Sequence, residues 1–179
     1  MRNFLNINTL SEQNVFQLVK RAIALKSGDT PKRLPITAVN LFFENSTRTY
    51  SSFQMAENRL NWQKIIINPQ TSSMTKGESL IDTLKTLKAI GVDVAVIRHS
   101  QNAWYKNLLT ATGHDLPQLV NAGDGSGQHP SQSLLDLVTI YEEFGRFKGL
   151  NIRIVGDLAH SRVERSNAEI LNNLGATLT

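Results

Sequence analysis

The residues best suited to chemistry form a hydroxyl-rich run at 46–49, Ser-Thr-Arg-Thr, which directly follows the apolar stretch 36–43. Where a strand gives way to a helix, such a run sets hydroxyls and a guanidinium beside unpaired backbone N–H groups and a partial positive charge. Arginine can hold two oxygens of one anion. The pattern therefore indicates a phosphate cradle that needs no glycine-rich loop. The alternative is that Ser46 caps a helix and Arg48 is a solvated surface base.

Further polar clusters follow the expected ends of other strands. Arg98, with His99 next to it, comes after the apolar run 94–97, where its charge can polarise a carbonyl oxygen; a surface ion pair is the alternative. The segment 121–132 is rich in glycine, which lets backbone approach a ligand closely. His129 precedes a proline, so its backbone is expected to be extended and its side chain to project from the loop. Gln132 follows in the first helical turn, and an ordinary capped loop is the alternative.

The segments 72–79 and 156–162 complete the set of polar clusters. Lys76 in the first of them can reach an anion as a flexible point charge, or it is simply solvated. Other sites are excluded: the glycines of 123–127 are not followed by Gly-Lys-Ser/Thr, and they lack the spacing of a nucleophile elbow. The histidines are too far apart to indicate a metal site, and the absence of cysteine excludes disulfides and thiolate sites.

The elements that must position these residues alternate between strand and helix. Helices are expected at 11–28, 47–60, 77–91, 102–112, 130–145 and 162–176, and strands at 36–43, 62–68, 92–100, 117–123, 152–158 and 177–179. This alternation predicts an α/β fold, a parallel sheet with helices on both faces. Ligands of such sheets bind beyond the carboxyl ends of the strands, so the polar clusters are expected to converge there.

A break at 144–151, with glycines and bases after a long helix, predicts a domain boundary. We expect a first domain at 1–149 and the beginning of a second α/β domain at 150–179. The chain has 179 residues, 40% of them hydrophobic, which supports a packed core. Its net charge of +4 is scattered, which suits a small anion better than nucleic acid. No apolar run approaches the ~18 residues of a membrane span and no signal peptide is recognisable, so a cytoplasmic location is expected.

Together these segments resemble the aspartate branch of the aspartate/ornithine carbamoyltransferase family. Residues 42–49 match the family's carbamoyl-phosphate signature, F-x-E/K-x-S-G/T-R-T, in full, and 72–79, 96–101, 121–137 and 156–167 resemble its later blocks in the same order. The ornithine branch shares S-T-R-T and H-P-x-Q but does not typically carry T-K-G-E-S or N-A-G-D-G-S-G-Q-H-P. The resemblance implies transfer of the carbamoyl group of carbamoyl phosphate to L-aspartate, in pyrimidine (UMP) biosynthesis, with no metal and no cofactor.

The resemblance also implies roles at the matching positions. The phosphate is held by Ser46, Thr47, Arg48 and Thr49. Thr49, Arg98 and His129 bond the carbonyl oxygen, and Gln132 binds the carbamoyl nitrogen. The residues expected to act on the reacting atoms are Arg48, Thr49, Arg98, His129, Gln132 and Lys76.

Four more residues complete the implied site. Ser72 and Lys76 match a loop lent by a neighbouring subunit to the carbamoyl phosphate site, in a homotrimer whose active sites are shared. Arg162, with Lys76, matches the binding of aspartate. Glu44 matches a residue that helps hold the two domains closed, through Arg162.

The family has a full second domain, so this chain is expected to be a fragment with weak or no activity alone. Two alternatives stay open: a non-catalytic phosphate-binding or assembly module of the same fold, and an ornithine carbamoyltransferase. The sequence identifies no general base for the attacking amine. Association with a regulatory chain or with dihydroorotase is left open as well.

Overall fold

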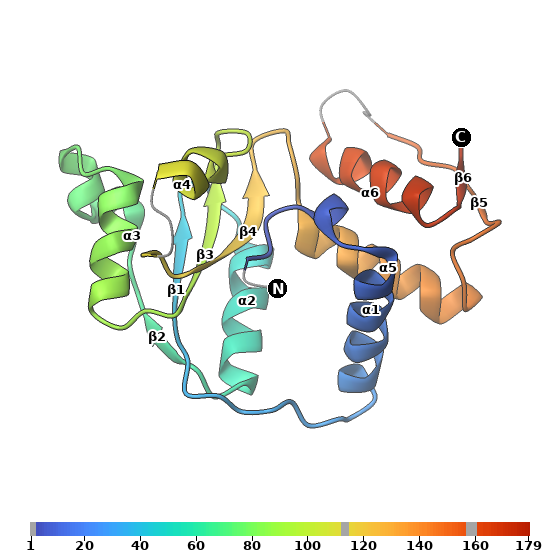
Figure 1. Ribbon diagram of the computed structural model, residues 1–179, viewed down its shortest axis with the longest axis horizontal. Helices are drawn as coiled ribbons and strands as arrows, with labels where there is room; N and C mark the ends of the chain where they lie inside the picture. Colours follow the sequence, from blue (N-terminus) through green and yellow to red (C-terminus); the bar gives the residue numbers. More distant parts are fainter. Residues whose placement is uncertain (1–2, 112–114, 157–160) are drawn as a thin grey trace. The chain divides into compact units, whose positions relative to one another are not determined.

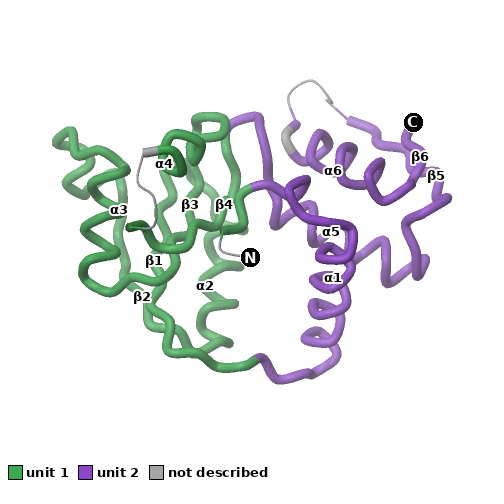
Figure 2. Tube along the Cα trace, in the orientation of Figure 1, with its two compact units in different colours: residues 1–5, 32–124 green, residues 6–31, 125–179 purple. Residues whose placement is uncertain are grey.

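The computed structural model describes residues 3–111, 115–156 and 161–179 (Figure 1). The chain forms two compact units, 1–5 with 32–124 and 6–31 with 125–179 (Figure 2). These compact units divide the chain at points other than residue 149. The domain boundary expected after residue 149 stays a prediction. No helix among the described residues is long and apolar enough to cross a membrane.

The first unit is built on a four-stranded parallel sheet in the order β2-β1-β3-β4. Its strands are β1 (Thr37–Phe42), β2 (Gln63–Ile65), β3 (Val94–His99) and β4 (Gln118–Asp124). The expected parallel α/β fold is confirmed. Strand β2 is shorter than the predicted 62–68, because pairing with β1 stops at Ile65 and the next residue, Ile66, is 80% exposed.

Side chains on the central strands alternate between two cores, one on each face of the sheet. The first core contains Val39, Leu41, Ala95 and Ile97, packed with α3 (Leu80–Ala89) and α4 (Tyr105–Ala111). The second contains Ala38, Phe42, Val94 and Val96, packed with α2 (Thr47–Arg59). Helices therefore cover both faces, which explains why β1 and β3 are mainly apolar on both faces rather than alternating between apolar and polar residues.

The α-helices of the described part of the second unit are α1 (Glu12–Lys26), α5 (Pro130–Phe144) and α6 (Arg162–Asn173). A two-stranded parallel sheet joins β5 (Asn151–Ile152) to β6 (Thr177–Leu178). Over the described residues the strand predicted at 152–158 is much shorter, since pairing with β6 ends at Ile152; residues 157–158 of that prediction lie outside the described part of the chain. The rings of Phe16, Tyr141 and Phe147 pack together at centroid distances of 5.5 to 5.8 Å and tie α1 to α5.

Helix boundaries follow local chemistry. The hydroxyl oxygen of Ser11 accepts from the N–H of Asn14 at the start of α1, which is the bond of a typical serine N-cap. Pro130 occupies the first turn of α5, and Gly145 ends it with a φ of +67°. Short 3₁₀ helices complete the fold at η1 (Ile7–Thr9), η2 (Pro69–Thr71) and η3 (Ser73–Lys76).

Candidate active site

The carboxyl ends of β1 and β3 lie side by side in the first unit. Phe42 pairs with Arg98 in the sheet register, and the N–H of Phe43 donates to the carbonyl oxygen of Arg98 at 2.9 Å. The chain then passes through Glu44 and Asn45 to the start of α2. The register thus brings the candidate cradle and Arg98 to one edge of the sheet, where ligands of such folds bind.

Helix α2 begins at Thr47, with Ser46 in the N-cap position. Within the part of the chain that the structure describes, the Ser46 hydroxyl makes no cap hydrogen bond, so the alternative in which this side chain caps the helix is wrong. Thr47 and Arg48 are exposed and Thr49 is half-buried. The first turn of α2 therefore presents hydroxyl groups, a guanidinium and backbone N–H groups at the helix's positive end.

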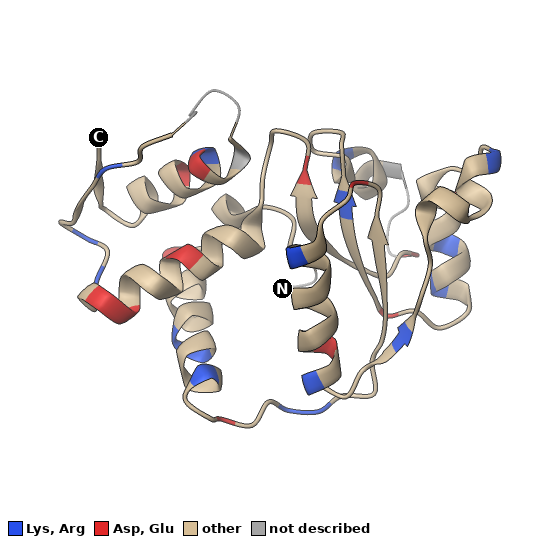
Figure 3. Ribbon diagram, turned by 180° about the vertical axis from the view of Figure 1, so that it is seen from behind, with Lys and Arg blue, Asp and Glu red and all other residues tan. Residues whose placement is uncertain are grey.

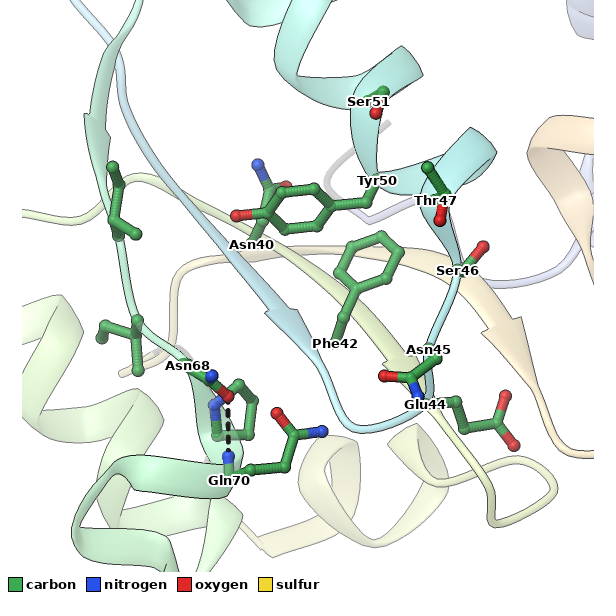
Figure 4. Close-up of a pocket in the computed structure, with 13 residues that line it drawn as sticks. Asn40, Phe42, Glu44, Asn45, Ser46, Thr47, Tyr50, Ser51, Asn68 and Gln70 are labelled. Carbon is green, nitrogen blue, oxygen red and sulfur yellow. Dashed lines mark hydrogen bonds between the residues drawn. The ribbon is translucent and has the colours of Figure 1, made fainter.

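The start of α2 borders a pocket of about 700 Å³ (Figure 4). The pocket is lined by Asn40, Phe42, Glu44, Asn45, Ser46, Thr47, Tyr50, Ser51, Ile66, Ile67, Asn68, Pro69 and Gln70. The rings of Phe42 and Tyr50 meet edge to face, with centroids 5.0 Å apart. Across from them, the side-chain oxygen of Asn68 accepts from the N–H of Gln70 at 3.0 Å. The pocket lining thus combines aromatic and aliphatic side chains with uncharged polar groups and one carboxylate, that of Glu44.

Arg98 is held by an acid from the neighbouring strand end. Its Nε lies 3.2 Å from Oε2 of Glu44, and the two side chains are only 11% and 30% exposed. Its Nη1 donates to the carbonyl oxygen of Ala122 at 3.4 Å. The family resemblance links Glu44 to Arg162, whose side chain lies outside the described residues, so that link stays a prediction. With two of its guanidinium nitrogens in contact with oxygens, Arg98 holds its charge in a defined position.

His99 lies beside this ion pair. Its ring packs on Phe43 with centroids 4.8 Å apart, and its Nδ1 accepts from the N–H of Gln101 at 2.9 Å. Burial lowers the pKa of His99, and the negative charge of Glu44 only partly opposes that shift. His99 is therefore neutral at pH 7, with its proton on Nε2, and adds no positive charge to the site.

The segment with Ser72 and Lys76 folds into two short 3₁₀ turns, η2 and η3. The Ser72 hydroxyl accepts from the N–H of Met74 at 3.4 Å and donates to the carbonyl oxygen of Pro69 at 3.1 Å. Lys76 ends η3 and is exposed. The Ser72 hydroxyl thus holds two successive turns, and the exposed Lys76 is the member of this pair that can reach outward.

The other candidates belong to the second unit, at the start of α5. His129 is the N-cap residue of α5 and lies at the end of the preceding loop. Its φ of −136° agrees with the extended backbone predicted before a proline, but its ψ of 72° lies outside the extended range. His129 is only 7% exposed, and its ring Nδ1 lies 3.3 Å from the hydroxyl of Ser131. Its backbone N–H donates to the hydroxyl of Ser166 at 3.3 Å. Gln132 lies in the first turn, as predicted. Of the cluster at 156–162, Asp157 to His160 lie outside the described residues.

Sequence reasoning missed a buried polar pair beneath the pocket. Asn40 on β1 lines the pocket, and its Nδ2 donates to Oε2 of Glu57 on α2 at 3.0 Å. Asn40 is 6% exposed and Glu57 is 2% exposed. Burial raises the pKa of Glu57, against the smaller opposing effects of the Asn40 hydrogen bond and the charge of Lys64. Asn40 is polar within the apolar run 36–43, and Glu57 is charged on the face of α2 that packs against the sheet. These two exceptions were the available signal in the sequence.

Lys and Arg, and Asp and Glu, are dispersed over the described helices and strands of each unit (Figure 3). The single guanidiniums at 48 and 98, and not a broad basic surface, are therefore the features that suit a small anion.

Most of the chain matches a single protein-family model. Residues 2–142 match the model of the aspartate/ornithine carbamoyltransferase carbamoyl-P binding domain. That span includes the whole four-stranded sheet, the start of α2, and the His129–Gln132 turn.

Relatives and solved structures agree with the family model. The chain is 77% identical over 179 residues to the aspartate carbamoyltransferase catalytic subunit of Leuconostoc mesenteroides, covering 100% of this chain and 60% of that relative. It is 60% identical over 176 residues to that of Lactiplantibacillus plantarum, covering 98% and 56%. A crystal structure of aspartate transcarbamoylase from Trypanosoma cruzi, in complex with carbamoyl phosphate and aspartate, superposes with a TM-score of 0.85 at 31% identity, over 99% of this chain and 59% of that one. The chain thus spans about 60% of the length of the relatives it matches.

Proposed function

We propose, from the premise that this chain belongs to the aspartate/ornithine carbamoyltransferase family, that it binds carbamoyl phosphate as part of an aspartate carbamoyltransferase. The reaction transfers the carbamoyl group to L-aspartate and gives N-carbamoyl-L-aspartate and phosphate. One observation carries the proposal: α2 begins with a hydroxyl that caps nothing, among the described residues, beside a pocket at the carboxyl edge of a parallel sheet.

In this proposal Ser46, Thr47, Arg48 and Thr49 bind the phosphate. Helix N–H groups and hydroxyls donate to its oxygens, and Arg48, exposed in the first turn of α2, supplies a charge that can fold over a bound dianion. The same groups stabilise the phosphate as it leaves, so the cradle serves both the substrate and the product.

The carbonyl oxygen of the substrate is the second centre. Attack by the aspartate amine puts negative charge on that oxygen, and donors that are already oriented stabilise it without reorganising. Arg98, Thr49 and His129 are the proposed donors, and the Glu44–Arg98 ion pair supports the choice because it holds one guanidinium in a fixed place. Removal of one such donor typically costs on the order of 100-fold or more in rate.

Two further parts of the proposal concern assembly and the second substrate. We infer a homotrimer in the cytoplasm, in which Ser72 and Lys76 of one subunit complete the site of a neighbouring subunit. The exposure of Lys76 at the end of η3 supports this inference. Arg162, at the first position of α6, is the proposed contact for aspartate. Native mass measurement tests the trimer, which a single-chain mass at working concentration would exclude.

Calorimetric titration with carbamoyl phosphate tests the cradle. Arg48→Ala is expected to lose about 2–4 kcal/mol of binding free energy, the scale for a buried ion that loses its partner. Arg59→Ala is the matched control, because Arg59 is an exposed arginine at the opposite end of the same helix. It should bind as the wild type does. Unchanged affinity in Arg48→Ala, or equal losses in both variants, would overturn the cradle.

A separate assay tests the amino acid. Carbamoyl transfer to L-aspartate and to L-ornithine should be compared, and a preference for ornithine would overturn the aspartate branch while leaving the cradle intact. The same assay on this chain alone measures how much activity its residues support.

A further inference from the structure

Gln132 and Asp136 lie one turn apart on α5 and are joined by their side chains. Nε2 of Gln132 donates to Oδ1 of Asp136 at 3.0 Å. The second carboxylate oxygen, Oδ2, accepts from Nδ2 of Asn167 on α6 at 2.6 Å. All three side chains are half-buried. Asp136 thus sits between two amide side chains and accepts one hydrogen bond from each.

This arrangement decides which end of the Gln132 amide faces outward. An ionised carboxylate has acceptors and no donor, so each amide that touches it must offer its NH₂ group. The oxygen Oε1 of Gln132 is therefore turned away from Asp136. The chemistry of the pair, and not the similar shapes of the two amide ends, sets this orientation. Gln132 then presents a hydrogen-bond acceptor.

We propose that Asp136 is a positioning residue, which fixes the Gln132 amide so that Oε1 accepts from the NH₂ group of a carbamoyl substrate. The inference rests on the function proposed above, in which Gln132 contacts that nitrogen. A carbamoyl NH₂ group needs an acceptor, and a free glutamine offers either end of its amide with similar ease. Asp136 removes that ambiguity before the substrate arrives.

Helix α6 provides the fixed point for this turn of α5. Besides the Asn167 contact, the hydroxyl of Ser166 accepts from the N–H of His129 at 3.3 Å, and Ser166 is fully buried. Nε2 of Gln128 also donates to Oε2 of Glu169 at 3.2 Å. Neighbouring residues of α6 therefore hold the segment that carries both His129 and Gln132.

Asp136→Asn tests the proposal with almost no change in shape. Asparagine has one acceptor oxygen where aspartate has two, so one of the two neighbouring amides must turn to face its NH₂ group. Whenever Gln132 is the one that turns, its own NH₂ group meets the NH₂ group of the substrate. Two ligands separate the effects by titration calorimetry on this chain. Phosphonoacetamide carries an anionic phosphonate and a carboxamide, whereas inorganic phosphate lacks the carboxamide.

The variant is expected to bind phosphonoacetamide about 10-fold more weakly, the scale of one lost hydrogen bond, and phosphate within about 2-fold of the wild type. Gln132→Ala should show the same selective loss, and adding Asp136→Asn to it should cost nothing more. Asn167→Ala, which keeps the Gln132 contact, should give a smaller loss for phosphonoacetamide alone and serves as the second variant if Asp136→Asn does not fold. Glu143→Gln, an equal charge change at an exposed site on α5, should leave both affinities unchanged.

The outcomes are distinct. Equal weakening of both ligands, no weakening of either, or full additivity with Gln132→Ala would overturn the positioning role and leave the phosphate cradle standing. If the wild-type chain binds neither ligand, the proposed function fails and the inference falls with it.

Discussion

Replacing Glu57 by glutamine should stabilise the protein at neutral pH, against the usual rule that changes at buried sites destabilise. Glu57 is 2% exposed and receives one hydrogen bond, from Asn40. Its Oε1 and the Oδ1 of Asn40 have no partner among the described residues. A glutamine at 57 keeps the existing bond through its oxygen and can donate from its NH₂ group to Oδ1 of Asn40. The two side-chain amides would then be joined by two hydrogen bonds, and neither acceptor would remain without a partner among the described residues.

The magnitude follows from these atoms. A buried polar group without a partner costs about 1–3 kcal/mol, so pairing two of them contributes on the order of 1–2 kcal/mol. The lost attraction to half-buried Lys64 offsets roughly 0–1 kcal/mol of this. We expect a net gain of about 1 kcal/mol, or about 2–4 °C in melting temperature for a chain of this size.

The pH dependence supplies the sharper test. Because burial raises the pKa of Glu57 above its ordinary value of 4.5, the native state binds more protons than the unfolded state between these two values. Wild-type stability from this group is therefore greatest below pH 4.5 and is lost as pH rises through the raised pKa. The advantage of Glu57→Gln should vanish in acid and should grow as the pH rises through the raised pKa of Glu57.

Urea unfolding of the wild type and Glu57→Gln across this pH range measures both effects. Glu143→Gln, which neutralises an exposed carboxylate, is the control for net charge. A loss of stability at neutral pH in Glu57→Gln, or a gain that does not change with pH, would refute the reciprocal pair.

Three other predictions concern the core, a helix cap and a histidine. Leu41→Ala, at a fully buried site in the core shared by β1 and α3, should lose about 2–5 kcal/mol in urea unfolding, and a loss under 1 kcal/mol would contradict the packing. Ser79→Ala removes the acceptor for the N–H of Asp82 at 3.1 Å and should cost about 1 kcal/mol, while Ser79→Thr, which keeps the hydroxyl, should cost less. Because burial lowers the pKa of His99, its stability contribution is present above its ordinary 6.5 and is lost as pH falls through the lowered pKa. His99→Gln should reduce the decline in urea midpoint on acidification, and an unaltered decline would exclude His99 as its source.

The sequence alone predicted the features that depend on short stretches of chain. The runs that became β1 and β3 are mainly apolar and do not alternate, because both faces of a central parallel strand are buried. The serine before α1, the proline that opens α5 and the glycine that ends it mark their boundaries through local backbone chemistry. The candidate cradle at the start of α2 was likewise visible, since strand, hydroxyls and helix are consecutive.

Only the tertiary structure decided which polar groups meet. Glu44 reaches Arg98 because β1 and β3 are neighbours in the sheet, an order that no local pattern encodes. Asn40 meets Glu57 because α2 packs back over β1, and Asp136 gains Asn167 because α6 packs on α5. Such pairs join residues far apart in the chain, and burial then makes each unmatched donor or acceptor costly. The spacing of residues in the sequence shows neither which distant residues meet nor how deeply they are buried. The side chains that hold the candidate site in place therefore became visible only in the folded chain.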